Sequence, residues 1–120
     1  MRKEHENLYQ RLDILEQAGL IEKRVAEQTD IIIQLIYAGE TEIDMEKMEM
    51  FTTHIAMAMQ RILNGTEENP LAQETLEALQ EEAVYEGAVK LAEKIYEAVS
   101  VDFPDVEREY LTVHLCNLLN

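Results

Sequence analysis

Apolar residues recur every three or four positions along this chain, and they almost nowhere alternate with polar ones as they would in a strand. This spacing predicts an all-α fold. Leu8, Leu12 and Leu15 mark a first helix, and Gly19 can close it in a left-handed cap. A second helix is expected over residues 20–37.

The third predicted helix is the most apolar stretch of the chain. Asp44 is expected to be its N-cap, and Gly65 its C-terminal end. Its apolar stripe consists of Met45, Met48, Phe51, Ile55, Ala58 and Ile62. The same helix carries His54 and Arg61, which are two helical turns apart and therefore share one face.

The C-terminal half contains three further predicted helices. Asn69-Pro70 is typical of an N-cap and a first helical residue, so a short helix should begin there. A longer helix is expected over residues 82–101. Asp102, with Pro104 in the first turn, should open the last helix. No linker-like stretch divides the chain, so the pattern predicts one domain.

Composition and charge narrow the classes of function. The chain has 120 residues, of which 47% are apolar, so it can bury a core without disulfides. Its formal charge of -15 repels phosphate backbones and anionic membranes, so we expect no direct contact with nucleic acid and no membrane association. The longest apolar run, residues 31–38, is far shorter than the ~20 residues of a membrane span. A single cysteine, Cys116, allows no internal disulfide and is compatible with a reducing cytosol.

The sequence gives little support to metal or cofactor chemistry. His114 and Cys116 are two residues apart, so they diverge on a helix and cannot bind one ion. Neither His54 nor His114 follows a Glu by three positions, as in di-iron bundles. No Gly-rich phosphate loop and no nucleophile elbow is present. We therefore expect no metal and no cofactor.

The two histidines of the apolar stretches, His54 and His114, allow two interpretations. In the simpler one, each is a partly buried side chain satisfied by a hydrogen bond. In the other, each stays neutral near pH 7 and attacks a phosphoryl group. Arg61 would then supply the counter-charge. Glu107, two turns before His114, could hold a ring nitrogen or pair with a basic residue. Spacing does not show whether the two histidines meet.

Several stretches together resemble the PTS regulation domain (PRD) of bacterial antiterminators and sugar-operon activators. They are Phe51–Ile55 with Arg61-Ile62, Gly65, Asn69-Pro70-Leu71, Tyr85–Ala88 with Leu91–Ile95, and Glu107 with Tyr110–Leu115. Their order fits one copy over residues 20–120, after an N-terminal helical extension over residues 1–19. Two departures are Thr53, where many copies have Asp, and Glu81-Glu82, where Tyr-Pro is usual.

The resemblance implies a five-helix PRD-type bundle, here with an additional short N-terminal helix, that pairs as a homodimer. It implies a cytoplasmic bacterial regulator of transcription or antitermination rather than an enzyme. By position, His54 and His114 would be the phosphoacceptors, with Arg61 and Glu107 in support. The donors implied are the phosphocarrier protein HPr or EIIB components of the phosphotransferase system.

Two other functions stay open. The chain could be a helical dimerisation or interaction module that keeps the PRD fold but is not phosphorylated. Thr53 favours this reading, as does the lack of an RNA-binding, DNA-binding or transport module in this sequence. A small helical enzyme that uses His54 and a carboxylate as acid and base is the third alternative.

Overall fold

The computed structural model describes residues 5–39 and 42–120, and its only regular secondary structure over them is helical, with no strand. The six helices are α1 (Glu6–Gln17), α2 (Lys23–Gly39), α3 (Met45–Asn64), α4 (Gln73–Gln80), α5 (Tyr85–Ala98) and α6 (Asp105–Leu119). The predicted all-α fold is confirmed. In this described part of the chain, no helix is both long and apolar enough to cross a membrane. Of the predicted extension over residues 1–19, the first four lie outside the described residues.

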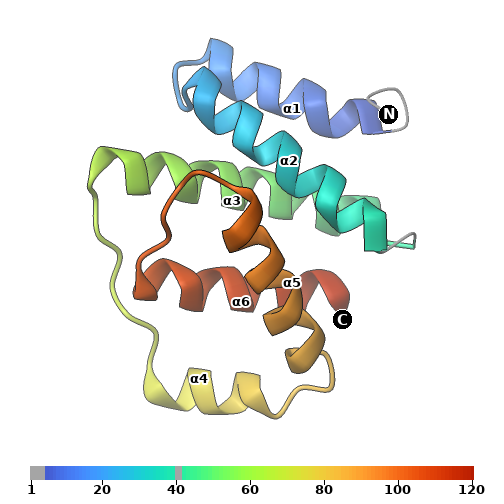
Figure 1. Cartoon of the computed structure of the whole chain (residues 1–120), viewed down its shortest axis with the longest axis vertical. Helices are drawn as coiled ribbons and strands as arrows, with labels where there is room; N and C mark the ends of the chain where they lie inside the picture. Colours follow the sequence, from blue (N-terminus) through green and yellow to red (C-terminus); the bar gives the residue numbers. More distant parts are fainter. Residues whose placement is uncertain (1–4, 40–41) are drawn as a thin grey trace.

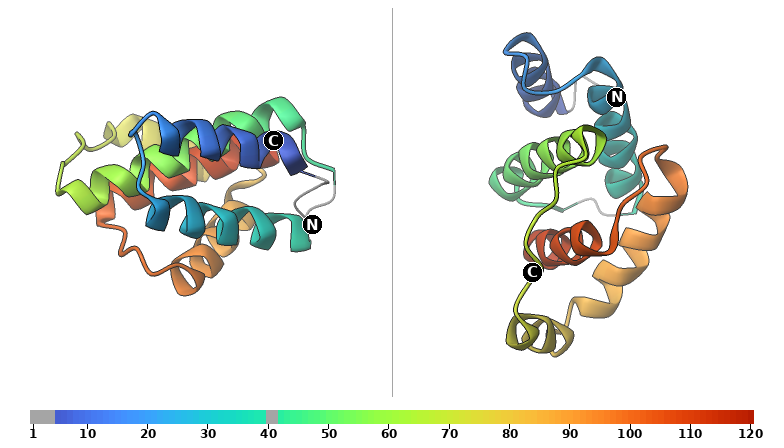
Figure 2. Two further views of the ribbon diagram at one scale, coloured as in Figure 1. Left: turned by 90° about the horizontal axis from the view of Figure 1, so that it is seen from above. Right: turned by 90° about the vertical axis from the view of Figure 1, so that its left-hand side faces the viewer.

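Helix α3 lies at the centre of the bundle (Figure 1). The antiparallel pair α1 and α2 packs on one side of it, and α6 packs on the other. Helix α5 crosses between α2 and α6, and α4 contacts α6 at the far end of the molecule (Figure 2). Helices α3 and α6 run antiparallel beside each other, so residues that are distant in sequence meet between them.

The core is built around one face of α3. Met48, Phe51 and Ile55 are buried there, as the apolar stripe predicted, and Met59, which was not part of that stripe, is buried as well. Fully burying one such side chain stabilises the fold by about 1.5–3 kcal/mol. These anchors fix the rotation of α3, and they therefore fix which residues stand at the edge of its buried face.

Three predicted helix ends are confirmed. Gly19 and Gly65 both have left-handed backbones, with φ of 77° and 74°, which a glycine adopts without steric cost. The Asp44 carboxylate accepts a hydrogen bond from the Lys47 N–H (3.4 Å) and caps α3. Helix α2 starts later than predicted because the Leu20 N–H still belongs to the end of α1, where it bonds to the Leu15 carbonyl (2.9 Å).

The prediction that Asn69-Pro70 starts α4 is wrong, since that helix begins three residues later. The segment before it is tied to α6 instead. The Tyr110 hydroxyl donates to the Asn69 carbonyl (2.8 Å), and the Leu71 N–H donates to the Glu109 carboxylate (3.3 Å). These bonds hold the segment against α6 and outside the helix, so the favourable local start of a helix is not used.

The predicted start of the last helix at Asp102 is also wrong. The residue before its first turn is Pro104, which is extended, and α6 begins at the next position. Phe103 is buried, and its carbonyl accepts a hydrogen bond from the Arg108 guanidinium (2.9 Å). Burial of Val99 and Val101 likewise ends α5 three residues before the predicted boundary. Tertiary contacts, rather than local capping, set this connection.

Candidate functional site

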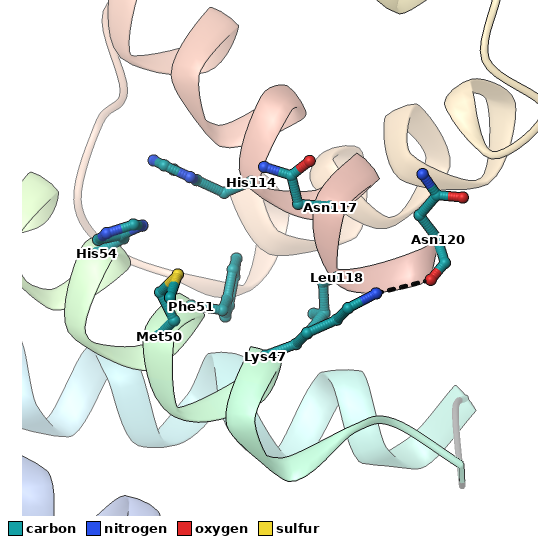
Figure 3. Close-up of a pocket in the computed structure, with 8 residues that line it drawn as sticks. All are labelled: Lys47, Met50, Phe51, His54, His114, Asn117, Leu118 and Asn120. Atoms are coloured by element: carbon teal, nitrogen blue, oxygen red, sulfur yellow. Dashed lines mark hydrogen bonds between the residues drawn. The ribbon is translucent and has the colours of Figure 1, made fainter.

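The imidazoles of His54 on α3 and His114 on α6 lie against each other. Their ring centroids are 4.5 Å apart, and the rings are tilted by 43°. Figure 3 shows them side by side at one end of a pocket between the two helices. The antiparallel packing of α3 and α6 brings the two residues together, which no sequence spacing could show.

Each histidine stands at the edge of a buried helix face. Phe51 and Ile55 anchor α3 beside His54, which is itself exposed. Leu111 and Leu115 anchor α6 around His114, which is half-buried. No hydrogen bond joins either imidazole to another residue in the described ranges 5–39 and 42–120. Within those ranges each ring contacts the other ring rather than a hydrogen-bonding protein partner.

The environment keeps His114 neutral. Burial, helped by the neighbouring His54 ring and the positive charge of Arg61, lowers the pKa of His114 from about 6.5 to about 4. At pH 7 the imidazole is therefore uncharged and has a free lone pair on one nitrogen. A neutral imidazole with an unused nitrogen at the protein surface is a nucleophile.

An ion pair between Arg61 and Glu107 stands beside the two rings. The guanidinium donates from Nη2 to Oε1 (3.1 Å) and from Nε to Oε2 (3.4 Å). The Glu107 side chain is only 3% exposed, whereas that of Arg61 is 32% exposed. Of the two roles considered for Glu107, the structure shows the pairing with a basic residue and not the contact with a ring nitrogen. Arg61, whose positive charge acts on His114, is thus already bound to Glu107.

The pocket next to the histidines has a volume of about 320 Å³. It is lined by Lys47, Met50, Phe51, His54, His114, Asn117, Leu118 and Asn120, and so contains no Asp or Glu. The Lys47 ammonium donates to the Asn120 carbonyl (2.8 Å) at the end away from the rings (Figure 3). Lys47 was not predicted as a site residue, although it lies two turns before His54 on the same helix face.

A second hollow, of about 310 Å³, lies on the other side of His54. Arg11 of α1 reaches it, donating to the Thr53 hydroxyl (3.1 Å) and pairing with Glu49 (3.6 Å). Thr53, the position where many PRD copies carry Asp, therefore contacts the N-terminal helix. Arg11 was not predicted as a site residue, because nothing in the spacing of α1 indicates that it reaches α3.

The remaining histidine, His5, lies apart from this site. The His5 ring stacks on Tyr37 of α2, with centroids 3.8 Å apart. Nowhere in residues 5–39 and 42–120 do three His, Cys, Asp or Glu side chains gather closely enough to hold a metal ion. Cys116 is buried and free.

Comparison with known proteins gives a family. The chain matches the PRD domain over residues 29–118, which is most of its length. It is 29% identical over 112 residues to the uncharacterized protein YhfY of Escherichia coli (strain K12), a match that covers 90% of this chain and 91% of that protein. No solved structure matches the chain. PRD domains are regulatory rather than catalytic, and both histidines and their ion pair fall within the matched residues. On this match, the chain belongs to the PRD domain family.

Proposed function

We propose that this protein is a phosphorylatable PTS regulation domain. In this proposal it accepts a phosphoryl group on His54 or His114 and controls sugar utilisation at the level of transcription or antitermination. The observation that carries the proposal is the contact between the two imidazoles, whose centroids are 4.5 Å apart, within a chain of the PRD family. The protein acts as a non-enzymatic cytoplasmic switch, with HPr or an EIIB component as donor.

Transfer of the phosphoryl group needs an uncharged imidazole nitrogen, access for the donor protein, and a nearby cation. The lone pair of a neutral imidazole attacks phosphorus, the bond from phosphorus to the donor breaks, and the donor leaves with that electron pair. The proton on the other ring nitrogen of the acceptor is then released. His54 is exposed, so a donor protein can approach it from solvent. Arg61 is close enough to the pair to influence His114, and it can offset the added charge.

The negative charge of a phosphoryl group would change how α3 and α6 pack. A phosphoryl group adds close to two negative charges, and here they arrive beside a buried carboxylate in a chain of charge -15. The group competes with Glu107 for Arg61, whose side chain is the more exposed of the two. We propose that this competition changes how α3 and α6 pack and thereby alters a homodimer of the protein. Met50, which is 62% exposed beside His54, would lie in or near the dimer contact.

The test is phosphotransfer to the purified protein. Incubation with phosphorylated HPr, and separately with phosphorylated EIIB components, should add an acid-labile phosphoryl group that intact mass spectrometry detects. A variant with both His54→Gln and His114→Gln should gain none, whereas His5→Gln should behave like the parent. If the parent protein accepts no phosphate from any of these donors, the signalling function is wrong.

A second candidate is an interaction module that has kept the fold without the phosphorelay. The observation in its favour concerns Thr53, which precedes His54 and has no carboxylate to orient the ring. Its hydroxyl instead accepts a hydrogen bond from Arg11 of α1. In this case the double variant His54→Gln, His114→Gln would leave partner binding and function in cells unchanged. A loss of either in that variant speaks against the module.

A further inference from the structure

The N-terminal helix α1 brings a second arginine, Arg11, to the side of His54. This helix lies outside residues 29–118, over which the chain matches the PRD domain. The Arg11 guanidinium donates to the hydroxyl of Thr53, the residue next to His54 in sequence (3.1 Å). Arg11 and His54 also line the same hollow, of about 310 Å³, and His114 is not among the residues that line it. The hollow therefore joins this arginine to the exposed histidine of the pair.

The Arg11 guanidinium is only loosely held. It has five N–H donors, of which one bonds to Thr53. Its contact with the Glu49 carboxylate is long, at 3.6 Å, and its Nε is buried without a hydrogen-bond partner among the described residues. The Glu49 side chain is 26% exposed, so water can solvate that carboxylate when Arg11 moves away. Because partly exposed ion pairs contribute little to stability, a new anion can recruit Arg11 easily.

Arg61, the other arginine beside the histidines, is harder to recruit. It makes two hydrogen bonds to Glu107, whose side chain is only 3% exposed. Drawing Arg61 away would leave that carboxylate buried and unpaired, which is strongly unfavourable. The charge of Arg61 acts on His114, so a phosphoryl group on His114 is the one that would compete for it. A phosphoryl group on His54 has a second cation in its own hollow.

We propose that Arg11 binds the phosphoryl group of phosphorylated His54 and thereby links helix α1 to the phosphorylation state of that histidine. The inference rests on the proposed function, because it takes His54 as a phosphoacceptor. The group offers three acceptor oxygens and close to two negative charges, which a guanidinium binds well. Glu46 and Glu49 line the same hollow and oppose this attraction, so the net effect is modest. When Arg11 turns to the phosphoryl group, its bond to Thr53 and its pairing with Glu49 are lost.

The test uses a chemical donor, so it does not depend on finding the physiological one. Phosphoramidate transfers its phosphoryl group to a neutral imidazole nitrogen: the new P–N bond forms, the P–N bond of the reagent breaks, and ammonia leaves. The other ring nitrogen of the imidazole releases its proton to water. All proteins carry His5→Gln and His114→Gln, so that His54 is the only imidazole, and circular dichroism confirms that each is folded. The second pKa of the attached phosphoryl group is measured from the pH dependence of its phosphorus NMR shift.

Arg11→Ala should raise this pKa by about 0.5, because a cation close to the group favours its dianion even at the dielectric constant of water. Glu49→Gln should lower the pKa by a similar amount, and Arg11→Lys, which keeps the charge, should stay close to the parent. Thr53→Val removes only the hydrogen bond to Arg11 and should not raise the pKa. Arg24→Ala is the matched control, because Arg24 is exposed and bonds to Ser100 instead.

An Arg11→Ala protein with the same phosphoryl pKa as the control would overturn the proposal, as would failure of His54 to accept the group from phosphoramidate. An equal rise in Thr53→Val would also overturn it, because the docking of α1 rather than the charge of Arg11 would then be responsible. These outcomes are separate from the fate of the proposed function. If HPr and EIIB transfer nothing but the pKa depends on Arg11, the signalling role is wrong and the Arg11 site stands. Transfer from either donor, with no effect of Arg11 on the pKa, leads to the reverse conclusion.

Discussion

Removal of Arg61 should destabilise the fold far more than removal of an ordinary surface arginine. Glu107 is 3% exposed, and both oxygens of its carboxylate accept from Arg61. In Arg61→Ala that carboxylate stays buried without its partner. Breaking a fully buried pair costs about 3–5 kcal/mol. Because water reaches the Arg61 side of this pair, we expect a smaller loss, of about 2–3 kcal/mol.

The asymmetry of the pair makes this estimate testable. Glu107→Gln removes the charge but keeps the shape and a hydrogen-bonding oxygen, so it should cost only about 1 kcal/mol. Replacing both residues, as in Arg61→Met with Glu107→Leu, should restore most of the stability lost in Arg61→Ala. Urea unfolding followed by circular dichroism measures each difference from the midpoint and slope. Arg24→Ala is the matched control, because Arg24 is exposed and its bonds to Ser100 are long, at 3.5 Å. If Arg61→Ala unfolds at the same urea concentration as this control, the pair does not stabilise the contact between α3 and α6.

Three further predictions concern stability. Because burial holds the pKa of His114 near 4, below its ordinary value, the unfolded chain binds more protons between pH 6.5 and 4. The contribution of the neutral ring is thus complete above pH 6.5 and is lost as pH falls toward 4, so urea midpoints of the parent should fall more steeply over this window than those of His114→Gln. Gly87→Ala should stabilise α5 by about 0.5–1 kcal/mol, since the added Cβ would meet only Leu119 Cδ1, at 3.9 Å. Gly65→Ala should instead destabilise the fold by about 1 kcal/mol, because the φ of Gly65 is +74°. Equal shifts of the thermal midpoint in the two variants would contradict this. Gln60→Ala should lower the free energy of unfolding in urea by about 1–2 kcal/mol. The Gln60 side-chain amide accepts a hydrogen bond from the Glu22 N–H and donates one to the Glu22 carboxylate, each at 2.8 Å. An unchanged urea midpoint would show that these two bonds do not stabilise the fold.

Local sequence rules predicted the helices well where local forces decide. The left-handed glycines and the Asp44 cap act within one turn of the chain, and each was found as expected. The rules failed where a contact with a residue distant in sequence overrides the local preference. Asn69-Pro70 has the residues of a helix start, but the Tyr110 hydroxyl of α6 bonds to the Asn69 carbonyl and ties that segment to α6 instead. Such a bond spans two elements, and no pattern within either one contains it.

In the candidate site too, features within one helix could be predicted, whereas contacts between helices could not. Helical spacing placed His54 and Arg61 on one face of α3 and Glu107 two turns before His114, and the resemblance to the PRD family assigned the phosphoacceptor and supporting roles. The contact of the two rings, and the choice of Glu107 as the partner of Arg61, depend on how α3 packs on α6. The contribution of Arg11 could not be predicted either, because it depends on where α1 docks. Lys47, by contrast, could have been found from its two-turn spacing to His54.

The central claim is that the paired histidines carry phosphate in response to the phosphotransferase system. It is tested most directly in cells, by isolating the protein under conditions that preserve phosphohistidine and locating phosphate by peptide mass spectrometry. The comparison is between cells with and without a sugar that this system transports. The proposed function predicts phosphate on His54 or His114 whose occupancy changes between the two conditions. Absence of phosphate from both histidines in both conditions would contradict it.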